Sequence, residues 1–342
     1  MIVRLIGFMA FLIASVSAVA AAEVCVSCAG PDVTYRCTVE KSEKIEQMPD
    51  AQRVLEQVCT KILVKTGSHA KCDIKRDKAE CPGNPNPLGV ARVVEIDTTG
   101  GPGFGFQHYK SYDFLNPKEV VLTFDDGPLP NRTTAILAAL NAECTRAIFF
   151  SVGKVAAGYP EILHDVAKSG NTVAAHTMLH KDLSKMPFDQ AKDEIEKSFS
   201  VVHRAVGGPT APFFRFPFLR DSPETLKYLA SRNVAVFSTD IDSFDLKGGK
   251  PDKLVKHIMT LLEKRGKGII LMHDIQPHTA AAMPELLKQL KAGGYKVVQM
   301  TAKAPIDTLP EYDELINKDM QGMPTALSDR PLNSVVKTIS GQ

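Results

Sequence analysis

Short apolar runs alternate with longer amphipathic stretches from Lys118 to about Ala302. The short runs hold four or five residues and are bounded by turn-forming residues, which is typical of buried strands. The longer stretches repeat their apolar positions with helical spacing. This alternation predicts a parallel sheet covered by helices. The predicted strands are Val120–Phe124, Ala147–Phe150, Thr172–Ala175, Phe213–Phe216, Val234–Ser238, Ile269–Met272 and Lys296–Met300. The predicted helices are Thr133–Leu140, Glu161–Lys168, Phe188–Val206, Pro223–Ser231, Lys253–Lys264 and Met283–Ala292.

Polar side chains follow five of these seven strands, always at the end where the strand finishes. In an open sheet the first and sixth strands would lie about 24 Å apart, too far to share one site unless the strand order were shuffled. A closed or nearly closed barrel brings all the carboxyl ends to one mouth. We therefore expect a (β/α) barrel with fewer than eight repeats. The residues concerned are Asp125, Asp126, His176, His180, Arg215–Phe218, Asp240–Asp245 and His273.

The first 22 residues have the pattern of a secretory signal. Arg4 provides a positive start, Leu5–Val16 is an apolar core, and three alanines before Glu23 form a small-residue cleavage site. An uncleaved membrane anchor is the alternative, and only then would the protein contact a membrane. Either interpretation predicts export, to the periplasm or out of the cell.

Residues 23–85 form a small segment that contains six of the seven cysteines. An even number of cysteines in a short exported segment predicts a disulfide framework with fifteen alternative pairings. A zinc site is the rival interpretation, because Cys25 and Cys28 have ligand spacing. Ala51–Lys65 predicts one amphipathic helix, and disulfides would supply most of the stability of so short a segment. The cysteines are Cys25, Cys28, Cys37, Cys59, Cys72 and Cys81.

The remaining segments carry weaker patterns. We expect residues 86–117 to be a linker and irregular cover, residues 118–302 to be the main domain, and residues 303–342 to be a partly ordered extension. A net charge of +2, with no dense run of Lys and Arg, gives no indication of nucleic-acid binding.

Two motifs carry the candidate chemistry. Asp125 and Asp126 end the first strand before Gly127-Pro128, where adjacent side chains point in different directions, so one can bind a metal while the other faces substrate. A solvated turn is the alternative. His176 and His180 are four residues apart and would share a face if they lay on a helical turn. Together with a strand-end carboxylate they would form a two-histidine, one-carboxylate site, which leaves positions open for water and substrate.

Five separated motifs between about Pro117 and Met300 resemble the NodB-type polysaccharide deacetylases, carbohydrate esterase family four. The resemblance implies a distorted (β/α) barrel of about seven strands, here preceded by the cysteine-rich segment. It also implies a divalent metal, zinc first, with cobalt or another transition metal as alternatives. The motifs are Thr123–Gly127, His176–His180, Arg215–Phe218, Asp242–Leu246 and Leu271–His273.

The resemblance also implies a role for each motif residue. Asp125 would be the general base, oriented and kept ionised by Arg215. His273 would be the general acid, tuned by Asp245. The remaining residues fall into two groups: metal ligands at Asp126, His176 and His180, and substrate contacts at Pro217, Phe218, Leu271 and Leu246. Among the contacts, the backbone N–H of Phe218 would stabilise the oxyanion and Leu271 would line the acetyl pocket.

One position departs from the family pattern. The fourth motif usually ends in Trp, whereas this chain has Leu246 there and no Trp anywhere. That difference bears on substrate identity rather than on the catalytic groups. We therefore expect a metal-dependent hydrolase that removes acetyl groups from an N-acetylated, or O-acetylated, polysaccharide or oligosaccharide. The alternatives are an exported glycan-binding protein without turnover and a related amidase that acts on a non-sugar amide.

Overall fold

The computed structural model describes residues 22–29, 33–39, 71–74, 84, 87–109 and 113–319. Each of the seven predicted strands is present: the bounds of Thr172–Ala175 are as expected, and the ends of the other six differ by at most two residues. All are parallel where they pair. They are β6 (Glu119–Asp125), β7 (Ile148–Ser151), β8 (Thr172–Ala175), β9 (Phe213–Phe214), β10 (Ala235–Phe237), β12 (Gly268–His273) and β13 (Lys296–Ala302).

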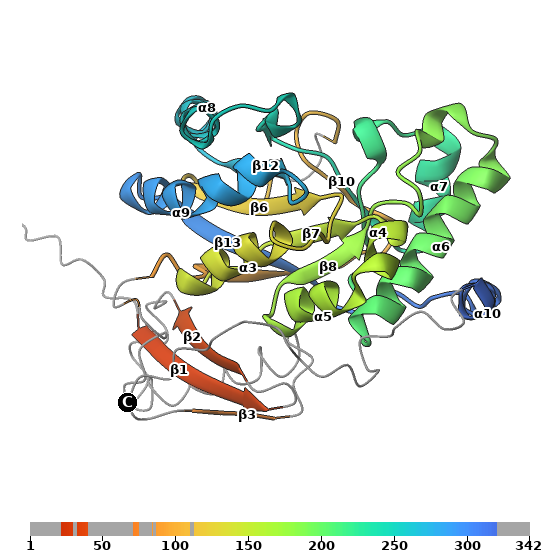
Figure 1. The fold of residues 1–342 in the computed structure, drawn as a ribbon, viewed down its shortest axis with the longest axis horizontal. Coiled ribbons are helices and arrows are strands. Elements are labelled where there is room, and N and C mark those ends of the chain that lie inside the picture. The colour runs from red at the N-terminus through yellow and green to blue at the C-terminus, as the bar shows by residue number, and fades with distance from the viewer. Residues whose placement is uncertain are drawn as a thin grey trace, which may run out of the picture.

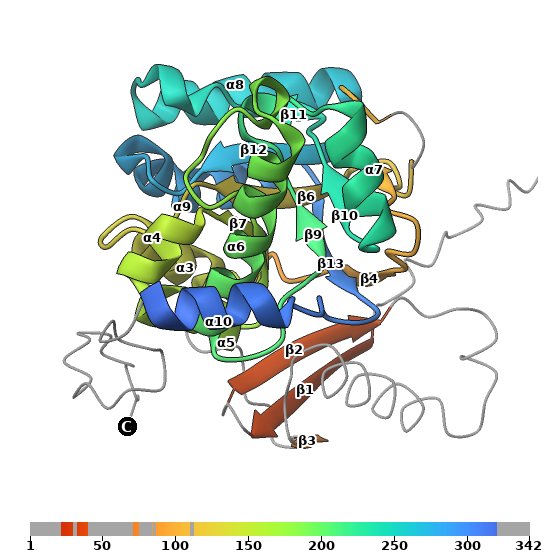
Figure 2. The same ribbon diagram turned by 90° about the vertical axis from the view of Figure 1, so that its right-hand side faces the viewer.

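The strands form a barrel with one seam. The strand order is β11-β12-β6-β7-β8-β9-β10-β5, where β11 is Ile241–Asp242 and β5 is Gly103–Phe104. Strands β10 and β11 lie near opposite ends of this path, yet only residues 238–240 separate them in the chain. Such a link spans roughly 14 Å at most, so the sheet must curl until its two sides meet. The distorted barrel is therefore confirmed, and the short segment between β10 and β11 crosses its seam (Figure 2).

Helices surround the strands (Figure 1). Two of them, α6 and α7, have the bounds that the sequence predicts. Helix α7 begins sharply because Ser222 and Thr225 form a capping box and Pro223 occupies the first turn. The predicted helices are α3 (Thr133–Ala142), α5 (Pro160–Lys168), α6 (Phe188–Val206), α7 (Pro223–Ser231), α8 (Pro251–Arg265) and α9 (Pro277–Ala292), and the structure adds α4 (Gly153–Gly158) and α10 (Pro310–Asp319).

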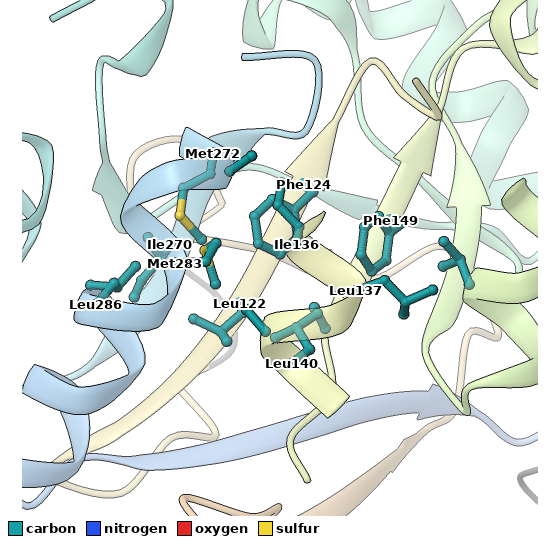
Figure 3. Close-up of a cluster of buried hydrophobic side chains, with 14 of the residues drawn as sticks. Leu122, Phe124, Ile136, Leu137, Leu140, Phe149, Ile270, Met272, Met283 and Leu286 are labelled. Carbon is teal, nitrogen blue, oxygen red and sulfur yellow. The ribbon is translucent and has the colours of Figure 1, made fainter. Parts of the chain in front are cut away.

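Side-chain alternation along β6 sets the direction of the Asp125 carboxylate. Leu122 and Phe124 point outward and pack with residues of α3 and α9 in one apolar cluster (Figure 3). Val121 points the other way, into a second cluster inside the barrel. Since side chains alternate between the two faces of a strand, Asp125 shares the interior face with Val121.

Several elements at the edges of the barrel and beyond it were not predicted. The segment expected to be an irregular cover instead contributes two strands: β4 (Arg92–Ile96) pairs with β13, and β5 pairs with β10. Helix α10 lies in the C-terminal extension and packs on α6 through Tyr312, whose hydroxyl donates to Asp193. No helix among the described residues is long and apolar enough to cross a membrane.

The cysteine-rich segment contains a small antiparallel sheet, β2-β1-β3. Its strands are β1 (Ala22–Ala29), β2 (Val33–Val39) and β3 (Lys71–Ile74). The register places Cys28 opposite Cys72. The predicted helix at 51–65 and almost all of the predicted signal lie outside the described residues, and the disulfide framework stays a prediction.

Candidate active site

Asp125 meets Arg215 inside the mouth of the barrel. The Nη1 group of Arg215 donates to Asp125 Oδ1 at 2.7 Å and to Thr123 Oγ1 at 2.8 Å, and Nη2 donates to the Ser238 carbonyl at 2.9 Å. The guanidinium also stacks 4.3 Å from the centre of the Phe150 ring. Both Asp125 and Arg215 are buried. A buried carboxylate with a charged donor at this distance is held in one orientation.

Asp126 points toward two imidazoles. Its Oδ1 atom lies 3.2 Å from Nε2 of His180 and 3.5 Å from Nε2 of His176. The three ligand atoms lie within 4.8 Å of one another, and no other group of three His, Cys, Asp or Glu residues in the described ranges comes as close together.

Two observations indicate that this cluster fits a metal. Asp126 Oδ1 is buried and has no hydrogen-bond partner among the described residues. A buried carboxylate oxygen without a partner is stabilised by a bound cation or by protonation. His176 donates through Nδ1 to the Arg215 carbonyl at 2.6 Å, so its Nε2 faces the cluster. Burial lowers the pKa of His176, against the carboxylates of Asp125 and Asp126, which favours the neutral imidazole that metals bind.

The two histidines do not lie on a helical turn. Residues 176–180 form a bend in which Thr177 and His180 have φ values of 63° and 56°, in the left-handed region. Hydrogen bonds brace this loop: Met178 N donates to the Glu194 carbonyl, and Leu179 N donates to the Glu194 carboxylate. The two histidines do lie close together, as the spacing predicts. The reason is not a helical turn but the shape of this loop, which hydrogen bonds to α6 hold in place.

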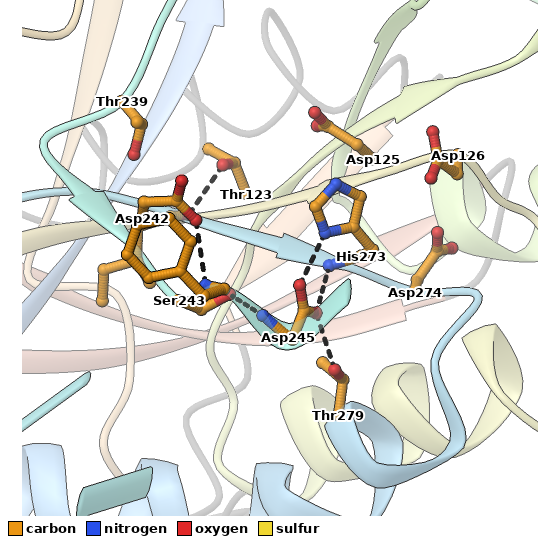
Figure 4. Close-up of polar contacts among 12 residues, drawn as sticks. Thr123, Asp125, Asp126, Thr239, Asp242, Ser243, Asp245, His273, Asp274 and Thr279 are labelled. Atoms are coloured by element: carbon orange, nitrogen blue, oxygen red, sulfur yellow. Dashed lines mark hydrogen bonds and ion pairs between the residues drawn. The ribbon is translucent and has the colours of Figure 1, made fainter. Parts of the chain in front are cut away.

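His273 and Asp245 form a second buried pair on the other side of Asp125 (Figure 4). His273 Nδ1 lies 2.6 Å from Asp245 Oδ1, while the His273 backbone N–H and the Thr279 hydroxyl both donate to Oδ2 at 2.7 Å. Burial alone would lower the pKa of His273, but Asp245, with smaller contributions from Asp125 and Asp126, raises it to about 9. Burial alone would raise the pKa of Asp245. The hydrogen bonds from His273 and Thr279 outweigh it, so the pKa of that carboxyl is lowered.

Sequence reasoning missed Asp274, which supports the Asp125–Gly127 turn from beneath. Its buried carboxyl accepts from Gly127 N and from the Thr133 hydroxyl, both at 2.7 Å. A Cβ atom on Gly127 would lie only 2.0 Å from Asp274 Oδ2, so this turn requires glycine. Burial and the nearby carboxylates of Asp126 and Asp125 raise the pKa of Asp274 to about 7. Its only sequence signal is its position, directly after the histidine that ends β12.

Exposed apolar side chains lie on the loops that carry the site residues. Phe218 is 60% exposed and its ring stacks edge-on to His180 at 5.0 Å, while Leu246 is 55% exposed. Pro217 and Leu271 are buried. Asp240 does not lie at the mouth as expected: it binds Ile269 N at the opposite end of β12 and pairs with Arg265.

Comparison with known proteins shows what the barrel is similar to. Residues 114–237 match the polysaccharide deacetylase family. A peptidoglycan-N-acetylglucosamine deacetylase of Bacillus cereus is 28% identical over 205 residues, 58% of this chain and 73% of its own. A chitooligosaccharide deacetylase of Bradyrhizobium is 27% identical over 199 residues, 54% of this chain and 90% of its own. The solved structure of a Bdellovibrio bacteriovorus peptidoglycan deacetylase is 32% identical with a TM-score of 0.58, covering 64% of this chain and 61% of that one.

These matches fall on the barrel that holds the site. The barrel is thus similar to polysaccharide deacetylases, and the relatives it resembles are hydrolases of that class.

Proposed function

We propose that this protein removes acetyl groups from N-acetylated polysaccharide, with Asp125 as base and His273 as acid. One observation carries the proposal: three groups lie at one mouth of the barrel. They are the Asp125 carboxylate bound by Arg215, the His273 imidazole bound by Asp245, and the cluster of Asp126, His176 and His180. Hydrolysis of an acetamide needs a group that takes a proton from water and a second that gives one to the leaving nitrogen.

The two proton-transfer groups are held in complementary states. Asp125 takes the proton of the attacking water, because Arg215 orients its carboxylate and compensates its charge. His273 carries a proton at neutral pH, because its pKa is raised to about 9, and it donates that proton to the departing amine. Water adds to the acetyl carbon, the carbon–nitrogen bond breaks, and acetate and the free amine leave.

Asp126, His176 and His180 would hold a divalent metal, which supplies Lewis-acid polarisation of the acetyl carbonyl and acidifies water. The donor set of two imidazoles and one carboxylate suits zinc, and cobalt is the second candidate. The Phe218 backbone N–H would donate to the developing oxyanion. Leu271 would line the acetyl pocket, and Pro217 and Leu246 would border the sugar chain.

Export is part of the proposal. The signal-like residues 1–22 and the concentration of cysteines in residues 23–85 both support action in the periplasm or outside the cell. Acetylated polysaccharide in those compartments is the partner that we propose.

The first test is acetate release from N-acetylglucosamine oligomers. Protein from Glu23 onward is stripped of metal, resupplied with zinc or cobalt, and compared with the Asp125→Asn variant. We expect metal-dependent acetate that falls by at least about 10²-fold in the variant. Tight metal binding without acetate from any sugar oligomer would overturn the proposal. Turnover of a simple acetamide in place of the oligomers would favour the amidase alternative, and glycan binding alone would favour the binding protein.

A further inference from the structure

Asp274 binds the backbone on both sides of Asp126, although the proposed mechanism uses it neither as a metal ligand nor for proton transfer. Its backbone N–H donates to the Asp125 carbonyl at 3.2 Å, just before Asp126. Its Oδ1 atom accepts from the Gly127 N–H at 2.7 Å, just after Asp126. One residue therefore binds the peptide groups on either side of a candidate metal ligand, and Asp274 lies just below Asp126 in Figure 4.

The residue held in this way has an unfavourable backbone conformation. Asp126 has a φ value of 81°, which residues with a Cβ atom rarely adopt. Such a conformation persists only where the surrounding contacts impose it. The Asp126 N–H also donates to the Phe150 carbonyl at 3.1 Å, so three hydrogen bonds fix the peptide groups that flank the Asp126 Cα atom. With the backbone fixed in this way, the carboxylate faces the two histidines of the cluster.

The Asp274 carboxyl is itself held in place. Its Oδ2 atom accepts from the Thr133 hydroxyl at 2.7 Å, and that hydroxyl accepts from the Leu129 N–H at 2.7 Å. Asp274 is only 2% exposed. A Cβ atom on Gly127 would lie 2.0 Å from Oδ2, so glycine leaves the space that the carboxyl occupies. Asp274 therefore presents a fixed, buried acceptor to the turn after β6.

The same residue connects the acid side of the site to the ligand side. Asp274 directly follows His273, whose backbone N–H and ring are bound by Asp245. One residue further on, the Ile275 carbonyl accepts from Arg132 Nη1 at 2.7 Å, next to the start of α3. The turn after β12 is thus fastened to the loop after β6. Movement of either one would displace the acid relative to the metal cluster.

We propose that Asp274 is a positioning residue for the metal cluster: it holds Asp126 in its left-handed conformation and so sets the affinity for the divalent metal. This inference rests on the proposed deacetylase function and adds a residue that its site requires. Loss of the acceptor leaves the Gly127 N–H unpaired and lets the flanking peptide groups relax, which turns the Asp126 carboxylate away from the histidines. Groups that orient metal ligands from behind typically change metal affinity by about 10- to 100-fold.

The test compares two substitutions of similar size at Asp274 in the full chain. Asp274→Leu removes both acceptor oxygens, whereas Asp274→Asn keeps one for the Gly127 N–H. Asp240→Leu is the matched control, because that carboxyl also accepts from two backbone N–H groups, those of Phe106 and Ile269, but at the opposite end of β12. Competition with a fluorescent zinc chelator gives the zinc Kd of each metal-stripped protein. Acetate release at saturating zinc gives kcat and KM.

We expect Asp274→Leu to raise the zinc Kd about 30-fold and to lower kcat about tenfold, with KM within about twofold of the native value. Asp274→Asn should stay within about threefold of the native protein in both Kd and kcat, because it keeps the acceptor. Asp240→Leu should unfold at lower urea concentration yet keep the native zinc Kd.

Three results would overturn the positioning role. They are a native zinc Kd in Asp274→Leu, an equal rise in Asp240→Leu, and an Asp274→Asn variant as weak as Asp274→Leu, which would indicate an effect of charge rather than of the acceptor. If Asp274→Leu does not fold, Thr133→Val replaces it, because it removes the hydroxyl that holds Oδ2, with Thr133→Ser as its control. We expect Thr133→Val to raise the zinc Kd about fivefold, and a native Kd would overturn the proposal.

Zinc affinity also separates this inference from the proposed function. A native protein that binds zinc, and binds it more weakly in Asp274→Leu, but releases no acetate from any sugar oligomer would support the positioning role and overturn the deacetylase. Acetate release with equal zinc affinity in both proteins would do the reverse.

Discussion

The two sides of the site differ in how fully their polar groups are satisfied. On the acid side, the Asp245 carboxylate accepts three hydrogen bonds and His273 is fixed by two of them. On the ligand side, Asp126 Oδ1 has no hydrogen-bond partner among the described residues, and Asp126 and His180 both have left-handed backbone. The acid side is complete as the chain folds, whereas the ligand side stores strain and an unmet charge that a cation would relieve.

The largest effect should come from a substitution at Asp126, on the ligand side. We expect Asp126→Asn to lower kcat/KM by about 10³-fold or more, because the metal cluster loses its only carboxylate. The same change should raise the unfolding free energy of the metal-free protein by about 1 kcal/mol, because it removes an uncompensated buried charge. Acetate assays measure kcat/KM, and urea unfolding of the metal-free protein measures the unfolding free energy. A metal-free variant that is less stable than the native protein would contradict the contrast.

Substitution at Asp245 should have the opposite effect on stability. We expect Asp245→Asn to lower kcat about 10²-fold and the unfolding free energy by about 3 kcal/mol, because it breaks a buried, hydrogen-bonded pair. Thr279→Val is the matched control, since it removes one hydrogen bond to the same carboxylate. Its losses should be smaller and in the same direction.

The pH profile sharpens the same comparison. His273 donates only while protonated, and its pKa is raised to about 9, so activity should hold below that pH and fall above it. Without the Asp245 carboxylate the pKa of His273 drops, and the basic limb should move to lower pH. The stability from this pair is complete below the unfolded histidine pKa of about 6.5 and is lost as pH rises through about 9. A basic limb that stays in place in Asp245→Asn would remove His273 as the acid.

The smallest expected effect concerns the apolar border rather than either polar side. Leu246→Trp should lower KM for sugar oligomers about threefold with little change in kcat, because an indole offers a larger face to a sugar ring. Leu315→Trp, on the exposed surface of α10, is the control. An unchanged KM for both variants would separate Leu246 from substrate binding.

The sequence predicted the barrel strands well because each is buried and bounded by turns. It missed β5 and β11, which have two residues each and exist only through pairing with β10 and β12. It missed α4, a single turn-and-a-half bounded by glycines at both ends, because so short an element shows no periodicity. Tertiary pairing, not local pattern, defines these elements.

For the candidate site, too, the sequence predicted some features and missed others. Residues within motifs could be named from the sequence, and the structure brings Asp125, Arg215 and His273 to one mouth. Contacts that depend on geometry could not be predicted. Asp274 meets Gly127 from 147 positions away, and Asp240 turns away from the mouth to bind the start of β12. A chain position after a strand shows which end a residue occupies, but not the direction of its side chain.

On the proposed mechanism, Arg215 would serve both folding and turnover from one position. Its buried side chain joins the Thr123 and Asp125 side chains of β6 to the Ser238 carbonyl at the barrel seam, so the barrel depends on it whether or not catalysis is needed. His180 is one-third exposed and holds no strand in place. In a lineage released from selection for activity, the arginine would therefore outlast the histidine. Retention of Arg215 in a distant descendant would be evidence of shared architecture, while retention of His180 would be evidence that the descendant still works.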